Sequence, residues 1–238
     1  MRKRAKRIIF LCSSLAFLVG LFFQYISVYY HMDVKIIDTY KALEVDKVVY
    51  DGMITYGDKR SKIGIIFYPG GKVEYTSYEP LMRSLADEGF FCVLLEMPYN
   101  LAVFDIDGAN GIQDKFPAID KWYMMGHSLG GAMAGIYLAD NYKDYEGLIL
   151  LGSYVSNSLL HTDLEVISIC GSEDKVLNEY RYNKYKTNLP KDYHDMIIQG
   201  GNHSYFGVYG VQKGDGEATI TNEQQIKQTV DIIKLLIK

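Results

Sequence analysis

Cysteine and proline are scarce in this chain. Only 3 cysteines and 5 prolines occur among 238 residues, whereas glycine occurs 22 times. So few cysteines cannot form a disulfide framework. Cys12 lies in an apolar run, and Cys92 and Cys170 lie within expected strands, where a free cysteine behaves as a small hydrophobic residue. Frequent glycine with little proline indicates tight turns between strands and helices rather than disorder.

An excess of positive charge is also missing. The net charge of -4 gives no electrostatic case for binding nucleic acid. The chain has no internal repeat, no low-complexity tract and no sign of a second domain, and its 48% of hydrophobic residues is enough for one domain with a full core. No metal or organic cofactor is expected. The one acidic segment lacks the glycine and terminal glutamate of a calcium loop and is interpreted as a solvated loop. Its aspartates are Asp105, Asp107, Asp114 and Asp120.

A long uncharged run near the N-terminus predicts a membrane segment. Residues 1–7 include five lysines and arginines, and residues 8–30 contain no Asp, Glu, Lys or Arg. Such a run can cross a bilayer core of about 30 Å as a helix. The basic cluster predicts a cytoplasmic N-terminus, so the rest of the chain lies outside the cell membrane after a single pass. A cleaved signal peptide is the alternative. An uncleaved signal anchor is favoured because no small-x-small cleavage site follows the run.

The remaining chain alternates expected strands and helices. Residues 31–62 are expected to form a connector and a β-hairpin around Asp51-Gly52, and residues 63–238 are expected to form the catalytic domain. Continuous apolar runs predict strands buried on both faces, and periodic segments predict the helices between them. The expected fold class is α/β, with a doubly wound, mostly parallel sheet preceded by a transmembrane helix. The strands are expected at 63–68, 90–95, 122–125, 147–152, 164–170 and 195–199, and the main helices at 78–88, 129–139 and 221–237.

The stretch Gly126-His127-Ser128-Leu129-Gly130 is a G-x-S-x-G motif between an expected strand and a helix of small residues. A serine on so sharp a turn sits in strained backbone, and only very small neighbours fit beside it. The turn lifts the serine oxygen clear of the sheet and places the next N–H at a helix start. Ser128 is therefore the candidate nucleophile.

Two further side chains complete a candidate catalytic triad. His203 follows the last expected strand and Asp174 follows the strand before it, so both reach the same sheet edge as Ser128. A serine hydroxyl needs an imidazole to take its proton, and the imidazole needs a carboxylate to orient it. Glu173 competes with Asp174 for the acid, and Asp174 is preferred as the residue deeper in the loop. The order serine, acid, histidine is that of α/β-hydrolases.

An oxyanion hole requires two backbone N–H groups directed at the developing charge. Leu129, the residue after the serine, is expected to supply one. The second is expected from Pro69-Gly70-Gly71-Lys72, which follows a strand expected beside the strand that leads into Ser128. Gly71 is the preferred donor and Lys72 the next choice.

In combination, these motifs resemble those of the α/β-hydrolase superfamily, and most closely small, lidless, dienelactone-hydrolase-like proteins of bacteria. The likeness extends from about residue 60 to the C-terminus. It implies a Ser128–His203–Asp174 triad and hydrolase activity, but no particular substrate. Dienelactone hydrolases use a cysteine nucleophile, so the serine here favours ester chemistry. The stretches that carry the likeness are 67–73, 97–102, 126–134, 171–174, 200–207 and 212–216.

The expected function is hydrolysis of a small-molecule acyl ester at an open site. Only about ten residues separate the expected strands at 147–152 and 164–170, where larger relatives insert a lid. The tail after His203, including Tyr209, is expected to wall one side of the site, and residues 100–104 the other. An acyltransferase, a thioesterase and a non-catalytic binding module on the same scaffold remain open alternatives. The sequence leaves the acyl length and the oligomeric state undetermined.

Overall fold

The structure, a computed structural model, describes residues 2–35, 40, 43–191 and 193–237. It contains an 8-stranded sheet in the order β1-β2-β4-β3-β5-β6-β7-β8. The two pairings β1–β2 and β2–β4 are antiparallel, and the other pairings are parallel. The strands are β1 (Lys47–Tyr50), β2 (Met53–Tyr56), β3 (Ile63–Tyr68), β4 (Phe91–Leu95), β5 (Lys121–His127), β6 (Gly147–Leu151), β7 (Glu165–Gly171) and β8 (His194–Ile198).

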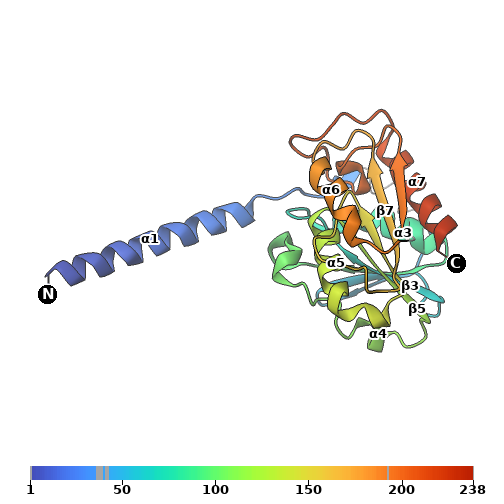
Figure 1. The fold of residues 1–238 in the computed structure, drawn as a ribbon, viewed down its shortest axis with the longest axis horizontal. Helices are drawn as coiled ribbons and strands as arrows, with labels where there is room; N and C mark the ends of the chain where they lie inside the picture. The colour runs from blue at the N-terminus through green and yellow to red at the C-terminus, as the bar shows by residue number, and fades with distance from the viewer. Residues whose placement is uncertain (1, 36–39, 41–42, 192, 238) are drawn as a thin grey trace.

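Helices cover both faces of the sheet, as Figure 1 shows. Because side chains alternate along a strand, neighbours in β3 enter different cores. Ile65 and Phe67 pack on the face covered by α3 and α7, whereas Ile66 and Tyr68 pack on the face covered by α5. The α-helices are α1 (Arg2–Ser27), α3 (Glu79–Asp87), α4 (Ile112–Lys115), α5 (Leu129–Asn141), α6 (Glu179–Tyr185) and α7 (Asn222–Leu236). The sequence-based prediction of a doubly wound, mostly parallel sheet is confirmed.

The hairpin formed by β1 and β2 is part of the catalytic sheet rather than a separate segment before it. Strand β2 pairs with β4 from Met53 opposite Leu95 to Tyr56 opposite Cys92. Tyr56 is fully buried. The apolar side chains of β2 therefore belong to the same two cores as the strands that carry the site.

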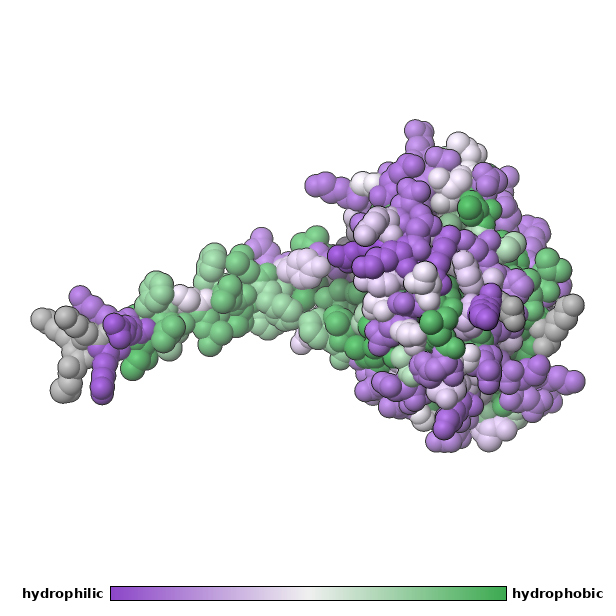
Figure 2. Space-filling model, viewed as in Figure 1, coloured by the Kyte–Doolittle hydropathy of each residue, from purple (hydrophilic) through white to green (hydrophobic). Residues whose placement is uncertain are grey.

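Helix α1 projects away from this domain (Figure 1). Its residues Lys6–Ser27 form a 22-residue stretch that is long and apolar enough to span a membrane. At 1.5 Å per residue, this stretch is about 33 Å long. Figure 2 shows apolar side chains along it and hydrophilic ones at its outer end. Near the domain, Ile26 of α1 is buried.

Candidate active site

Ser128 lies on a strained turn between β5 and α5. Its φ of 52° and ψ of -119° are rare for a residue with a side chain. The flanking glycines make the turn possible. A Cβ on Gly126 would lie 2.5 Å from the Gly131 nitrogen, and one on Gly130 would lie 2.2 Å from the Tyr68 carbonyl oxygen. The G-x-S-x-G spacing is thus a steric requirement of this turn, which presents the half-buried serine at the carboxyl edge of the sheet.

His203 and Asp174 form a buried pair. The distance between His203 Nδ1 and Asp174 Oδ2 is 2.7 Å, and the two side chains are 1% and 2% exposed. The other carboxylate oxygen, Oδ1, accepts the amides of Val176 and Leu177 at 2.9 and 2.8 Å. An ionised carboxylate only accepts hydrogen bonds, so Nδ1 carries the proton that faces it.

The competing acid, Glu173, has a different partner. Its Oε1 accepts the Ser172 hydroxyl at 2.9 Å. Of the two carboxylates weighed from the sequence, Asp174 is the one that contacts the imidazole of His203.

The remaining ring nitrogen of His203 is available for chemistry. His203 Nε2 is buried and has no hydrogen-bond partner among the described residues. With Nδ1 protonated, Nε2 of the neutral ring has a free lone pair. Ser128, Leu129 and His203 line one cavity of about 180 Å³. A base that takes a serine proton needs such a free lone pair, and here the lone pair belongs to a cavity that the strained Ser128 also lines.

The amides of Leu129 and Gly71 are the two donors expected for an oxyanion hole. Neither Leu129 N–H nor Gly71 N–H is hydrogen bonded within the described part of the chain. The two loops approach closely, since a Cβ on Gly71 would lie 2.8 Å from Leu129 Cδ2. The alternative choice, Lys72, is wrong as a donor. Its amide already donates to the Asn100 carbonyl at 2.7 Å.

Backbone strain is concentrated around this site. Apart from glycine, the described residues with positive φ are Lys72, Tyr99, Asn100 and Ser128, at 61°, 56°, 55° and 52°. Lys72 and Asn100 are joined by the hydrogen bond described above. Such conformations cost of order 1–3 kcal/mol each and persist where the surroundings impose them.

Sequence reasoning did not predict the role of His127 and Tyr78, which connect the loop at Gly70 to His203. The Gly70 amide donates to the Tyr78 hydroxyl at 3.1 Å, and Tyr78 Oη lies 2.7 Å from His127 Nδ1. His127 Nε2 lies 3.0 Å from the carbonyl oxygen of His203. A carbonyl only accepts, so His127 Nε2 carries the proton and the Tyr78 hydroxyl donates to Nδ1. No local sequence signal pairs Tyr78 with His127, because the two are 49 positions apart.

Asp215 is a second group whose role was not predicted. Its Oδ2 accepts the amide and hydroxyl of Ser204 at 2.8 and 2.6 Å, and its Oδ1 accepts the His203 amide at 3.3 Å. Asp215 therefore holds the turn that carries His203. The sequence signal at this position is the Gly-Asp-Gly turn at 214–216, part of the tail that was expected to wall the site rather than to hold His203.

A larger cavity of about 570 Å³ extends from Ser128, and Leu101 and Gln212 lie in its walls. These residues come from the two segments expected to wall the site. Tyr209, however, is not a wall residue: it is buried, with its ring centroid 6.3 Å from that of Tyr78. Its ring also packs near those of Tyr30 and His127, and the polar Gln212 lies in the wall instead.

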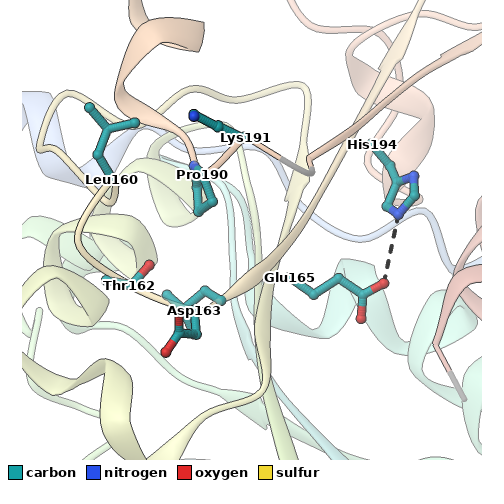
Figure 3. A pocket seen from close by; sticks show the side chains of 8 residues that line it. Leu160, Thr162, Asp163, Glu165, Pro190, Lys191 and His194 are labelled. Carbon is teal, nitrogen blue, oxygen red and sulfur yellow. Dashed lines mark ion pairs between the residues drawn. The ribbon is translucent and has the colours of Figure 1, made fainter.

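Another cavity, of about 720 Å³, lies at the opposite end of the strands (Figure 3). His194 Nε2 lies 3.8 Å from Glu165 Oε1 there, and both side chains are partly exposed. The lining contains none of the predicted site residues. No group of three or more histidine, cysteine or acidic side chains suited to a metal ion was found in the described ranges.

Comparison with known proteins identifies the family. The profile described as "Alpha/beta hydrolase family" matches residues 64–227, which is more than half of the chain. The chain belongs to the alpha/beta hydrolase family. The resemblance inferred from the motifs is therefore confirmed. No curated protein matches the sequence significantly.

Solved structures show the same hydrolase fold at low sequence identity. A monoacylglycerol lipase from Paleococcus ferrophilus has a TM-score of 0.59 at 12% identity, covering 81% of this chain and 99% of that one. A dienelactone hydrolase from Anabaena variabilis has a TM-score of 0.60 at 11% identity, covering 82% of this chain and 100% of that one. A structure from a study of carboxylesterases of the thaumarchaeon Nitrososphaera gargenis has a TM-score of 0.56 at 13% identity. It covers 79% of this chain and 96% of that one.

The stability of this hydrolase is expected to depend on pH through His127. Burial, with the neighbouring His203, holds the pKa of His127 well below its ordinary value of 6.5. The unfolded chain therefore takes up a proton below about pH 6.5 that the folded chain does not. The free energy of unfolding should fall by up to about 1.4 kcal/mol per pH unit as the pH drops below 6.5.

The substitution His127→Gln removes this titration while keeping a donor for the His203 carbonyl. The free energy of unfolding in urea is measured at pH 7.5 and at pH 5.5. Its decrease between the two pH values should be about 1.4 kcal/mol smaller in the variant than in the wild type. His161→Gln is the matched control, because His161 is exposed. His161→Gln should show the same decrease in the free energy of unfolding as the wild type. Equal losses in His127→Gln and the wild type would contradict the buried neutral state of His127.

Proposed function

We propose that this alpha/beta hydrolase is a membrane-anchored serine hydrolase that cleaves carboxylic esters. The observation that carries the proposal is the 2.7 Å contact of His203 Nδ1 with Asp174, which leaves the buried Nε2 unpaired in the cavity that Ser128 lines. The unbonded amides of Leu129 and Gly71 support an oxyanion hole at the same place. The lipase and carboxylesterase among the structural neighbours support ester chemistry by analogy.

The proposed reaction has two halves. In the first, Ser128 Oγ attacks the acyl carbonyl while His203 Nε2 takes its proton, and the Leu129 and Gly71 amides bind the oxyanion. The ester C–O bond breaks, and His203 returns the proton to the leaving alcohol. In the second half, His203 takes a proton from water, the hydroxide attacks the acyl-enzyme, and Ser128 regains its proton as the carboxylic acid leaves. Asp174 keeps Nδ1 protonated throughout and stabilises the imidazolium.

Anchoring through α1 is the second part of the proposal. The helix has the length and composition of a membrane span. The basic residues in its first two turns favour a cytoplasmic N-terminus and hence a catalytic domain outside the cytoplasm. Retention of the segment is supported by its use in the fold. The Tyr30 amide donates to the Lys72 carbonyl at 2.8 Å, and the Glu74 amide donates to the Tyr30 carbonyl at 2.9 Å.

The direct test is covalent labelling of the full-length protein in detergent with a fluorophosphonate, which reacts with activated serines. We expect a single modified residue, and mass spectrometry of the digested protein should assign it to Ser128. Labelling should block hydrolysis of a soluble p-nitrophenyl butyrate ester. Ser153 lines the same cavity and provides an internal comparison. Modification of Ser153 instead, or of no serine in folded protein, would refute the proposed nucleophile.

A further inference from the structure

The end of the apolar helix α1 and the candidate active site share one cavity. The cavity of about 570 Å³ is lined by Ser128, Gly71 and Leu101, and equally by Tyr25 and Val28 from the N-terminal segment. The ammonium group of Lys72 lies 4.1 Å from the ring centroid of Tyr25. The helix that provides the proposed anchor thus also forms part of the surroundings of the proposed nucleophile.

The connection is very short between the helix and the loop of residues 70–73, which we call the oxyanion loop because it carries the proposed donor Gly71. Helix α1 ends at Ser27, and Tyr30 already pairs with the chain at Val73. Three residues span at most about 10 Å. The catalytic domain therefore cannot move far from the end of the helix, and its active site faces the end of α1.

An apolar surface continues from the helix onto the domain. The Phe22 ring packs edge-on against Tyr99 and Phe104, with centroids 6.2 and 6.0 Å apart. We call these three residues the aromatic collar. Tyr99 and Phe104 come from the short helices η2 (Pro98–Asn100) and η3 (Ala102–Phe104), and each is about half exposed, at 52% and 49%. In Figure 1, this green segment lies beside the domain end of α1.

The collar has the position and chemistry of a membrane-interface contact. Phe22 is five residues before the end of α1, or about 7.5 Å along the helix axis. When α1 spans a bilayer, the collar therefore reaches the outermost acyl layer, where aromatic rings are favoured. The opening of the cavity beside Leu101 then lies within a few ångströms of the boundary between acyl chains and head groups.

We propose that the substrate is an ester-linked lipid of the membrane in which α1 is anchored. This inference rests on the proposed function and names its substrate class. The ester carbonyls of a glycerolipid lie at the boundary between its acyl chains and its head group. A lipid needs to move only a short way along the collar and α1 to place a carbonyl at Ser128. The reaction is the one already described, and its products are a fatty acid and a lipid alcohol.

The test uses the full-length protein reconstituted in vesicles of diether phosphatidylcholine, which has no ester bond. The vesicles contain dioleoylphosphatidylglycerol or dioleoylglycerol as the ester probe, and released oleate is measured by mass spectrometry. The same samples are assayed with soluble p-nitrophenyl butyrate, which tests the proposed function separately. The wild type is expected to release oleate from at least one of the two probes.

The decisive variant carries a flexible linker of about 12 glycine and serine residues between Ser27 and Val28. Such a linker has an average span of about 19 Å and separates the domain from the bilayer. Because Tyr25 and Val28 line the cavity, the readout is the ratio of the two activities. We expect the ratio of oleate release to butyrate hydrolysis to fall at least about tenfold relative to the wild type. The linker lies outside the segment that pairs with the oxyanion loop, so the loop is preserved.

Point substitutions supply a matched comparison. Phe104→Ser removes an apolar ring from the collar and should lower the ratio of oleate release to butyrate hydrolysis by about threefold or more. Leu160→Ser removes a similarly exposed apolar side chain, 59% exposed, near the start of β7. Leu160→Ser should leave both activities unchanged.

Three results would overturn the inference. The first is butyrate hydrolysis by the wild type with no oleate release from either probe. The second is a linker variant as active on vesicles as the wild type. The third is an equal loss of both activities on linker insertion, which would make α1 a structural support of the oxyanion loop. A wild type that neither hydrolyses butyrate nor reacts with a fluorophosphonate would instead reject the proposed function itself.

Discussion

Replacing Ser128 by alanine is expected to lower kcat for ester hydrolysis by about 10⁴- to 10⁶-fold. The substitution removes the only atom that forms the acyl-enzyme in the proposed reaction, while His203, Asp174 and the two amides remain. These groups can still bind the ester and polarise water, so a small residual rate is expected. The measurement is kcat and KM for p-nitrophenyl butyrate with full-length protein in detergent. KM should change little, because the lost interaction forms in the transition state.

The matched control for Ser128→Ala is Ser153→Ala. Ser153 Oγ lies in the same cavity and donates to the Ser128 carbonyl at 2.7 Å. Removal of this hydroxyl should lower kcat less than about tenfold, because the turn is held by several other contacts and is displaced only slightly. Thermal unfolding of both variants verifies that they remain folded. A folded Ser128→Ala protein with more than about 1% of wild-type kcat would contradict nucleophilic catalysis by Ser128.

The strands and the topology could be predicted from the sequence because burial on both faces leaves a simple pattern. The run Ile65 to Tyr68 is apolar throughout since its alternate side chains enter two different cores. Likewise, the start of α7 follows from local chemistry alone. The Thr221 side chain accepts the Gln224 amide, and the Gln224 side chain accepts the Thr221 amide. This single turn determines where the helix begins.

The choice between Gly71 and Lys72 could not be made in this way. Whether an amide is free depends on what lies opposite it, and the partner of Lys72 is the carbonyl of Asn100 in a loop 28 positions further along the chain. Lys72 and Asn100 both have positive φ, a conformation that asparagine tolerates but that is uncommon for lysine. Packing imposes that backbone geometry, and no local sequence pattern encodes it.

The same reasoning applies to the network around His127. His127 occupies a variable position of the G-x-S-x-G motif, which by itself assigns the side chain no role. Its ring in fact packs against that of His203, with centroids 4.5 Å apart, and its Nε2 binds the His203 backbone. Tyr78 completes this network from the end of a short helix, and its burial raises the pKa of its hydroxyl, so it remains a donor. Only the three-dimensional contact assigns these residues a positioning role.

The substitution Asp174→Asn is expected to lower kcat for butyrate hydrolysis by about 10⁴-fold, although it changes the shape of the side chain very little. The asparagine oxygen can still accept the amides of Val176 and Leu177, so the loop should keep its form. The NH₂ group then faces His203 Nδ1, which must act as an acceptor. The proton moves to Nε2, and Nε2 can no longer take the proton of Ser128.

The neighbouring carboxylate offers a control of identical chemistry. Glu173→Gln removes the same charge one residue away, and its partner is the Ser172 hydroxyl rather than the imidazole. We expect kcat within about threefold of the wild type, since loss of a nearby charge that does not contact His203 changes little. Fluorophosphonate labelling should slow in parallel with kcat in Asp174→Asn and stay normal in Glu173→Gln. The reverse pattern would make Glu173 the acid, and equal, small effects would mean that His203 acts without a carboxylate partner.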